Sequence, residues 1–175
     1  MDIFSVAVDG PAGSGKSTIA KLIAKELSIV YIDTGAMYRA VALFCIKSGI
    51  DTKNKEAVCS VLDKINMTIR PEKAGQRIFL DNEDVTDEVR SQKAGAGASD
   101  VAAIGDVREK LVAIQRKMAE GMSVIMDGRD IGTNVLPYAP VKIYLSAGAD
   151  ERAKRRCSEF EKLGQKYDFQ AVKEQ

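Results

Sequence analysis

A glycine-rich segment near the N-terminus carries the residues that best indicate chemistry. Residues 10–17 read GPAGSGKS, which matches the pattern G-x4-G-K-[ST]. Glycines let the backbone wrap a phosphate with inward N–H groups, and a helix beginning after the turn adds partial positive charge. Lys16 can reach the β- and γ-phosphates of a nucleoside triphosphate, and the Ser17 hydroxyl can ligate Mg²⁺. The alternative is a glycine-rich turn with an incidental lysine. The triphosphate-binding residues predicted here are Gly10, Pro11, Ala12, Gly13, Ser14, Gly15, Lys16, Ser17 and Thr18.

Two later segments place arginine beside turn residues. Residues 33–39 read DTGAMYR, so Arg39 falls in the first turns of a predicted helix, where a cation opposes the helix dipole at a cost of about 0.3–1 kcal/mol. An anionic ligand would offset that cost, and a solvated arginine is the alternative. Residues 127–130 read DGRD, where the Arg129 guanidinium suits bidentate phosphate recognition. The alternative is a turn with an internal ion pair, but its place after a buried strand favours function.

A charged helix predicted at residues 150–163 carries three arginines on one side. Arg152 and Arg156 form a like-charge i,i+4 pair that costs about 0.2–0.5 kcal/mol in isolation. A polyphosphate would relieve this repulsion. The alternative is a solvated charged face, because Glu159 can pair with Arg155.

The elements that would position these residues alternate along the chain. Short apolar runs predict buried strands at residues 3–8, 29–32, 123–126 and 141–145. Helical spacing predicts helices at residues 18–27, 34–48, 53–64, from 106 onward, 150–163 and from 168. Strands that alternate with helices indicate a parallel sheet covered on both faces, the α/β class. Ligands bind beyond the carboxyl ends of such strands, so the informative turns follow Val8, Ile32 and Met126.

Residues near two predicted helix starts also matter. Thr34 is a predicted N-cap, and Asp106 with Glu109 matches a capping box. Arg108 would again place a cation at a helix start, and Ser99 follows a run of alanine and glycine. Taken alone, Arg108 and Ser99 favour structural roles.

The middle of the chain changes character. Residues 66–70 and 77–80 predict two strands joined by a Pro-Glu-Lys-Ala-Gly turn, and residues 81–90 are acidic and predicted to be irregular. We therefore expect residues 61–97 to form an insertion built on a β-hairpin, outside the main sheet.

Composition bounds what the chain can do. Its 175 residues suit one domain. The 26 basic and 25 acidic residues leave a net charge of +1, so the chain lacks the excess of positive charge that is typical of unspecific nucleic-acid or membrane binding. The absence of histidine excludes Ser-His-Asp triads, Cys-His pairs and His-ligated zinc. Cys45, Cys59 and Cys157 form no CxxC pair, and no apolar run has membrane-span length. These features predict a soluble, cytoplasmic protein with reduced thiols.

The segments together resemble the bacterial-type cytidylate kinases, which are P-loop nucleoside monophosphate kinases. The resemblance rests on DGPAGSGKST, DTGAMYRA, GASDVAAIGDVRE and DGRDIGTNVLPYAPVKIYL, followed by the arginine-rich helix, and spans residues 3 to about 169. It implies a P-loop parallel sheet with helices on both faces, a monophosphate-binding insertion and a small helical lid. The implied division is a kinase core at 1–60 and 98–175, with the lid at about 149–170 and the insertion at 61–97.

The resemblance also implies roles for individual residues. Arg39 and Arg129 would hold the acceptor phosphate, and Thr34 and Tyr38 would line the acceptor pocket. Arg152, Arg155 and Arg156 would close over the donor phosphates. The residues that would read the cytosine edge are Ser99, Arg108 and Asp130.

The implied reaction is transfer of the γ-phosphoryl group of ATP, bound with Mg²⁺, to CMP or dCMP. Its partners would be small nucleotides, without nucleic acid or membrane, and we expect a monomer. A P-loop kinase for another small acceptor such as UMP, or a nucleotide-dependent switch, is the alternative. The family continues beyond the position of Gln175 with an arginine- and aspartate-rich segment, a strand and a helix, and we expect such a segment to follow in the full protein.

Overall fold

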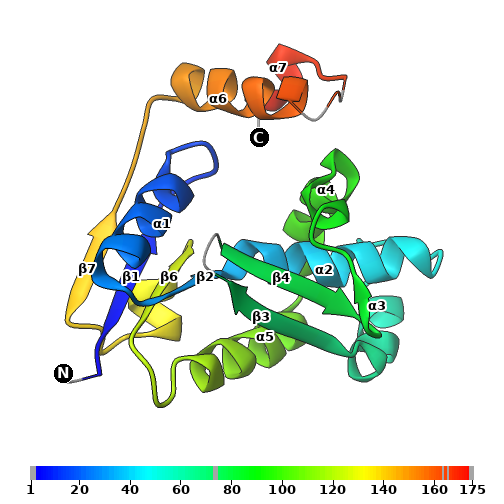
Figure 1. The fold of residues 1–175 in the computed structure, drawn as a ribbon. Helices are drawn as coiled ribbons and strands as arrows, with labels where there is room; N and C mark the ends of the chain where they lie inside the picture. The colour runs from blue at the N-terminus through cyan, green and yellow to red at the C-terminus, as the bar shows by residue number, and fades with distance from the viewer. Residues whose placement is uncertain (1–2, 73–74, 163, 165, 174–175) are drawn as a thin grey trace.

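The main sheet has four parallel strands in the order β2-β6-β1-β7 (Figure 1). The structure is a computed structural model that describes residues 3–72, 75–162, 164 and 166–173. The four strands are β1 (Ser5–Asp9), β2 (Val30–Asp33), β6 (Val124–Gly128) and β7 (Val141–Tyr144). The register pairs Val8 of β1, and Asp33 of β2, with Asp127 of β6. The turns after these three strands therefore lie together at the carboxyl end of the sheet, where parallel sheets bind ligands.

Helices cover both faces of this sheet, as the sequence predicted. Val6 and Val8 of β1 pack toward Ala20 and Ala24 of α1 (Lys16–Leu27). Ala7 points the opposite way because side chains alternate along a strand. It packs with a cluster that includes residues of α5 (Gly105–Met118) and of the short π-helix η3 (Ile131–Val135).

Strand β7 was predicted to be buried and is exposed instead. It pairs with β1 and forms an edge of the sheet. Val141 is 44% exposed and Tyr144 is 72% exposed. An apolar run indicates a strand, but it carries no information on the strand's place in the sheet.

A second sheet is antiparallel and separate from the first. Its strands are β3 (Met67–Glu72), β4 (Gly75–Leu80) and β5 (Glu83–Asp84), in that order. The predicted hairpin is thus confirmed, with Ile69 opposite Ile78, although residues 73–74 of its turn lie outside the described residues. The segment 81–90, predicted to be irregular, contains β5 and the 3-10 helix η2 (Glu88–Arg90).

The second sheet packs on α2 (Thr34–Lys47) and on α3 (Lys55–Val61), which continues into the 3-10 helix η1 (Leu62–Lys64). Helix α4 (Gln92–Ala102) joins this cluster and was not predicted. Its AGAGA run has low helix propensity, but Ser91 caps the helix and tertiary contact stabilises it. A Cβ at Gly97 would lie 3.0 Å from side-chain atoms of Ala42 and Thr52, so glycine permits the close approach of α4 to α2.

Both predicted caps were wrong. Asp33, not Thr34, caps α2 by accepting a hydrogen bond from the Ala36 amide at 2.9 Å. The Thr34 hydroxyl instead donates to the Asp127 carbonyl at 2.8 Å. Helix α5 starts at Gly105, so Asp106 lies inside the first turn and no side chain caps the helix.

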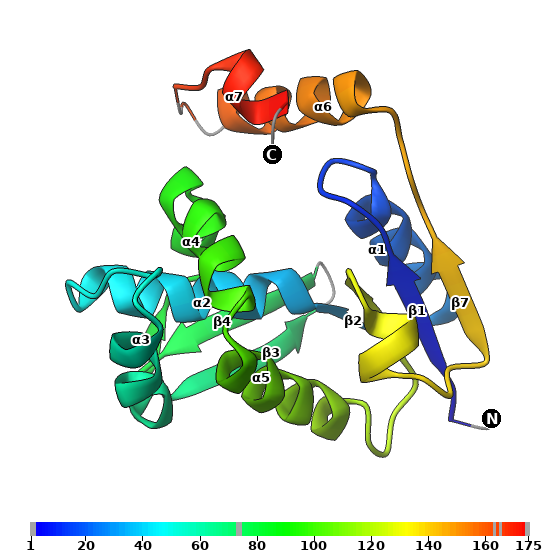
Figure 2. The same ribbon diagram turned by 180° about the vertical axis from the view of Figure 1, so that it is seen from behind.

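Helices α6 (Ala149–Lys162) and α7 (Phe169–Lys173) pair with each other beyond α4 and the glycine-rich loop at residues 10–15, the P-loop (Figures 1 and 2). They share a small cluster of their own, made by Ala153, Cys157, Phe160 and Val172. The last residue predicted for the first of them, Leu163, lies outside the described residues. In the described part of the chain, no helix is both long and apolar enough to cross a membrane.

Candidate active site

The P-loop runs from β1 into α1, and its backbone needs glycine. Gly13 and Gly15 have φ of 71° and 94°, and a Cβ at Gly13 would lie 2.7 Å from the Arg152 carbonyl oxygen. The loop therefore lies directly against α6. The Ser14 hydroxyl is buried and has no hydrogen-bond partner in the described residues. An unpaired buried hydroxyl in a loop at the start of a helix fits a site that awaits an anionic ligand.

Three cations donate to the loop's own carbonyl oxygens. Lys16 Nζ lies 3.4 Å from the Pro11 oxygen, Arg129 Nη1 2.6 Å from the Gly10 oxygen, and Arg155 Nη1 3.1 Å from the Ser14 oxygen. Burial, and then repulsion from Arg129, lower the pKa of Lys16. Burial also lowers the pKa of Arg129. Phosphate oxygens would give these crowded cations the negative charge that neutral carbonyls do not supply.

Asp127 is a candidate functional residue to which the sequence analysis gave no role of its own, although it belongs to the 127–130 turn. It is 2% exposed at the end of β6, and its Oδ2 accepts from the Ser17 hydroxyl at 2.5 Å. Its Oδ1 accepts from the Tyr31 hydroxyl at 3.1 Å. Burial, and then the nearby Asp33, raise the pKa of Asp127 to about 6, against the opposing effect of Ser17 and Lys16. The available signal was a carboxylate that ends a buried strand; only strand order shows that β6 lies beside the P-loop strand.

Asp9 holds the 127–130 turn in place. Its two carboxylate oxygens accept from the backbone amides of Ile131 and Gly132, at 2.7 and 2.8 Å. These amides open η3, the π-helix after the turn, and π-helical turns are frequent at functional sites. The end of β1 therefore fixes both the P-loop and the segment that carries Arg129.

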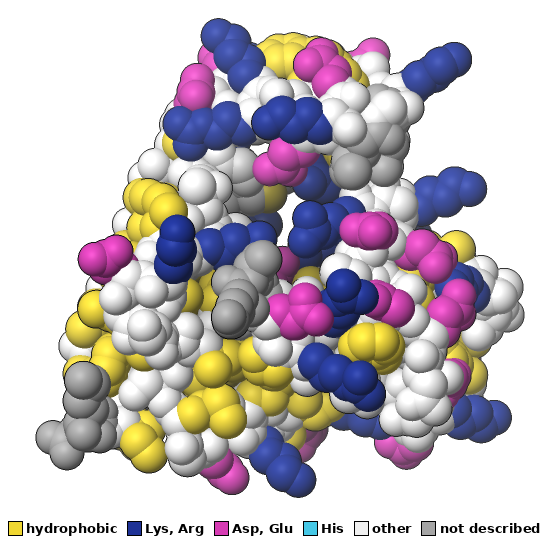
Figure 3. All heavy atoms as spheres, viewed as in Figure 1, with side chains coloured by type: hydrophobic (Ala, Val, Ile, Leu, Met, Phe, Trp, Pro, Cys, Tyr) yellow, Lys and Arg dark blue, Asp and Glu magenta, His cyan; other side chains and the backbone are white. Residues whose placement is uncertain are grey.

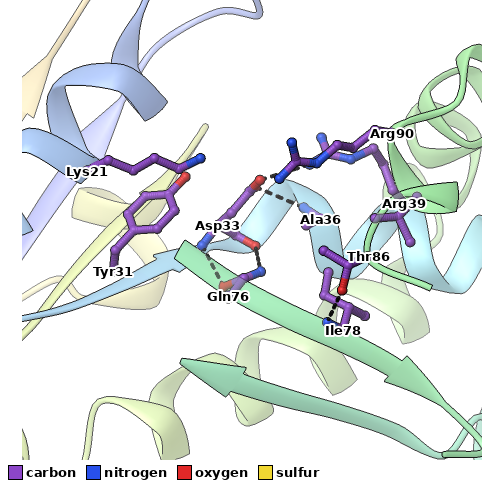
Figure 4. A pocket seen from close by; sticks show the side chains of 10 residues that line it. Lys21, Tyr31, Asp33, Ala36, Arg39, Gln76, Ile78, Thr86 and Arg90 are labelled. Carbon is purple, nitrogen blue, oxygen red and sulfur yellow. Dashed lines mark hydrogen bonds and ion pairs between the residues drawn. The ribbon is translucent and has the colours of Figure 1, made fainter. Parts of the chain in front are cut away.

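Arg39 is held at the start of α2 by Asp33. Its Nη2 lies 2.9 Å from the Asp33 carboxylate, while its Nε is buried without a partner in the described residues. The Gln76 side chain of β4 accepts from the Asp33 amide at 2.9 Å and donates to the Asp33 carbonyl at 3.0 Å (Figure 4). The second sheet is thereby joined to the residue that orients Arg39.

Three of the residues implied for base recognition or pocket lining, Tyr38, Arg108 and Asp130, lie close together. Asp130 pairs with Arg108 at 2.7 Å and also accepts from Asn134 at 3.2 Å. Burial, followed by the charge of Asp130, raises the pKa of half-buried Tyr38, whereas Arg108 lowers it. Ser99 lies exposed on α4, with no hydrogen bond to these residues in the described part of the chain.

A family model described as cytidylate kinase matches residues 6–175. The chain belongs to the cytidylate kinase family. Proteins named cytidylate kinase from Caldicellulosiruptor saccharolyticus, Oceanobacillus iheyensis and Geobacillus thermodenitrificans are 50%, 47% and 49% identical to it. The aligned segments cover 97%, 98% and 97% of this chain and 75%, 74% and 76% of the three relatives.

The match to the cytidylate kinase family model includes α6. The arginines of this helix have different partners. Arg155 pairs with Glu151 at 2.9 Å as well as reaching the P-loop, and Arg156 pairs with Glu159 at 2.8 Å. The solvated-face alternative in the sequence analysis paired Glu159 with Arg155, whereas in the structure Glu159 pairs with Arg156. The Arg152 Nε is buried and has no partner in the described residues. Figure 3 shows Lys and Arg side chains around a hollow beneath α6.

Proposed function

We propose that the chain transfers the γ-phosphoryl group of ATP to CMP or dCMP, giving ADP and CDP or dCDP. The observation that carries this proposal is the meeting of the P-loop, Arg39 and the 127–130 turn at one edge of the parallel sheet, in a member of the cytidylate kinase family. Relatives named cytidylate kinase support the same acceptor. The reaction joins two small nucleotides, and we place it in a monomer in the cytoplasm, a location that the three free cysteines support.

The donor triphosphate would lie along the P-loop. The loop's backbone amides and the N-terminus of α1 offer positive partial charge, and Lys16 would turn from the Pro11 carbonyl to the transferred group. Arg155, which now donates to Ser14, would exchange that carbonyl for phosphate oxygens. These exchanges place cations where charge develops during transfer.

Family members use ATP, and kinases that use ATP generally need a divalent metal. We propose Mg²⁺, because the side chains next to the P-loop offer hard oxygen donors, the Ser17 hydroxyl and the Asp127 carboxylate. Asp127 fits the role because it is buried and accepts only from hydroxyl groups in the described residues. When bound, the ion would neutralise charge on the β- and γ-phosphates.

The acceptor would lie between α2 and the 127–130 turn. Arg39 and Arg129 would hold its phosphate, which is anionic near neutral pH and so needs no strong general base. Asp130, with Arg108 beside it, would accept a hydrogen bond from the exocyclic amine of cytosine. Uracil carries a carbonyl at that position, so Asp130 favours cytosine over uracil.

Helix α6 would close the site over the donor phosphates. Arg152, Arg155 and Arg156 would line the closed site and exclude water, which protects ATP from hydrolysis. The contact of Arg155 with the P-loop supports this placement.

Acceptor-dependent release of ADP tests the proposal. The protein is given ATP and Mg²⁺ with CMP, dCMP, UMP, AMP or no acceptor, and ADP is followed by a coupled assay. We expect rapid release with CMP or dCMP and little without an acceptor. Slow release at one rate under all five conditions would indicate a switch and contradict the proposal.

A further inference from the structure

Gln115 is a buried glutamine at a core position of α5. It is 1% exposed, and Leu111 and Val107, one and two turns earlier on the same face of the helix, are buried and apolar. The apolar face of α5 therefore continues into a polar side chain, where an apolar one would suit the fold better. The Gln115 Nε2 has no hydrogen-bond partner among the described residues. Burying an amide donor without a partner costs free energy, so packing alone does not account for this residue.

Gln115 lies beside Tyr38 of α2, which the family resemblance places in the acceptor pocket. Tyr38 packs against the core cluster that contains Leu111, one helical turn before Gln115. Burial, followed by the charge of Asp130, raises the pKa of Tyr38, whereas Arg108 and then the Gln115 amide lower it. An amide has this effect when its N–H points toward the phenol oxygen. The unpaired donor therefore faces the Tyr38 hydroxyl, although Nε2 donates to none of the described residues in this structure.

Polar contacts fix the elements around this pair. Arg116, the residue after Gln115, donates to the Asn134 carbonyl at 2.7 Å. The Asn134 side chain in turn donates to Asp130 at 3.2 Å. The end of α5 is thus fastened to the segment that carries Asp130. A change of the Gln115 rotamer, rather than a movement of the helix, is therefore the available route for Nε2 to reach Tyr38.

We propose that Gln115 orients the Tyr38 hydroxyl toward the acceptor nucleotide. A phenol hydroxyl has one proton to donate, and its oxygen can accept. When the Gln115 Nε2 donates to that oxygen, the hydroxyl proton points away from the amide and into the pocket, where it donates to the acceptor. This inference rests on the proposed function and adds a positioning residue that does not itself touch the nucleotide. It gives a role to a donor that is buried and unpaired in the free protein.

Gln115→Met tests this role, because methionine is similar in size to glutamine and has no amide. Binding of CMP is measured by calorimetry, and stability is measured by denaturant unfolding without ligand. We expect Gln115→Met to weaken CMP about 3- to 10-fold, the usual effect of losing one neutral hydrogen bond. The same variant should raise the unfolding midpoint, because the unpaired amide is gone, and the KM for ATP should stay unchanged. Leu111→Met, a packing control one turn away, should neither weaken CMP nor raise the midpoint.

Tyr38→Phe decides whether the effect passes through the hydroxyl. In this background, Gln115→Met should change CMP affinity by less than about twofold. Wild-type CMP affinity in Gln115→Met, or equal weakening with and without the Tyr38 hydroxyl, would overturn the role of Gln115. A lowered unfolding midpoint would do so too, because it would show that the amide stabilises the fold. Gln115→Leu gives the same comparison should Gln115→Met fail to fold. A wild-type protein that does not bind CMP would instead refute the proposed function itself, and this inference with it.

Discussion

Asp127 is buried between Ser17 and Tyr31, and its carboxylate has a pKa raised to about 6 because burial disfavours its charge. The folded protein binds this proton more tightly than the unfolded chain does. The stabilising contribution of the protonated group is therefore complete below the unfolded pKa and is lost as pH rises through about 6. Near neutral pH, without metal, the fold carries the cost of a buried carboxylate.

Asp127→Asn should remove this pH dependence. In EDTA, we expect the free energy of unfolding of the variant, relative to wild type, to rise by up to about 3 kcal/mol between pH 4 and pH 7.5. Chemical denaturation at a series of pH values measures the difference. A difference that stays flat across this range would show that Asp127 has an ordinary pKa. In an assay with ATP, Mg²⁺ and CMP, the variant should also lose most of its kinase turnover, because it lacks the carboxylate that we propose as a metal ligand.

Asp130 determines the choice of base in this account. Asp130→Ala should lower kcat/KM for CMP by about 10- to 150-fold, because a hydrogen bond to a charged group contributes about 1.5–3 kcal/mol. The value for UMP should change little, so the preference for CMP narrows. Steady-state rates with both acceptors provide the measurement. An unchanged ratio would mean that Asp130 does not contact the base.

Single residues also show where sequence reasoning reached its limit. Lys16, Arg39 and Arg129 stand out because motif spacing and charge placement are local properties. Asp127 does not, because its importance depends on β6 lying between β1 and β2. Thr34 has the composition of a cap, but the preceding Asp33 caps α2, and the Thr34 hydroxyl bonds to the neighbouring strand instead.

At the scale of elements, the side chain of Gln76 forms hydrogen bonds between the two sheets. Gln76 of β4 forms two hydrogen bonds with the backbone of Asp33, at the end of β2. The Asp33 carboxylate in turn holds Arg39. The position of the second sheet is thus linked through Asp33 to the orientation of Arg39, the arginine that we propose binds the acceptor phosphate.

Gln76→Leu should uncouple the insertion from the acceptor site. We expect KM for CMP to rise severalfold while KM for ATP is unchanged, and stability to fall by about 1–2 kcal/mol through the two lost hydrogen bonds. Kinetics and denaturation measure both effects. Arg77→Gln, at the next position on β4, breaks only exposed ion pairs and should leave KM for CMP unchanged. Equal effects of the two substitutions would argue against a specific link through Gln76.

Periodicity predicted most elements, because burial of one face leaves a pattern in the sequence. It missed α4, where the packing of Gly97 against α2 overrides low helix propensity. It also misjudged β7, because the same apolar run suits a central strand and an exposed edge. Both errors arise from tertiary contacts, which local patterns do not contain.

At the scale of the whole molecule, the site lies between two parts that flank the core sheet. The inserted sheet with α2 and α4 stands on the acceptor side, and α6 crosses beyond the P-loop on the donor side (Figures 1 and 2). The inserted sheet packs on α2 through a buried apolar cluster, and Gln76 also bonds to Asp33 at the end of β2. Helix α6 contacts the P-loop through Arg155 and the Ser14 carbonyl. In the proposed function, Arg155 exchanges the Ser14 carbonyl for phosphate oxygens as the site closes on two nucleotides and excludes water.

The central claim is that these parts transfer phosphate from ATP to CMP, and direct detection of CDP tests it. Incubation with ATP, Mg²⁺ and CMP is followed by chromatography of all four nucleotides. The account predicts CDP and ADP in equal amounts, no CDP when either substrate is left out, and a rate at least ~10²-fold lower in folded Lys16→Ala. Lys25→Ala, an exposed lysine on the same helix, should match the wild type. ADP formation without CDP, or an undiminished rate in Lys16→Ala, would contradict the account.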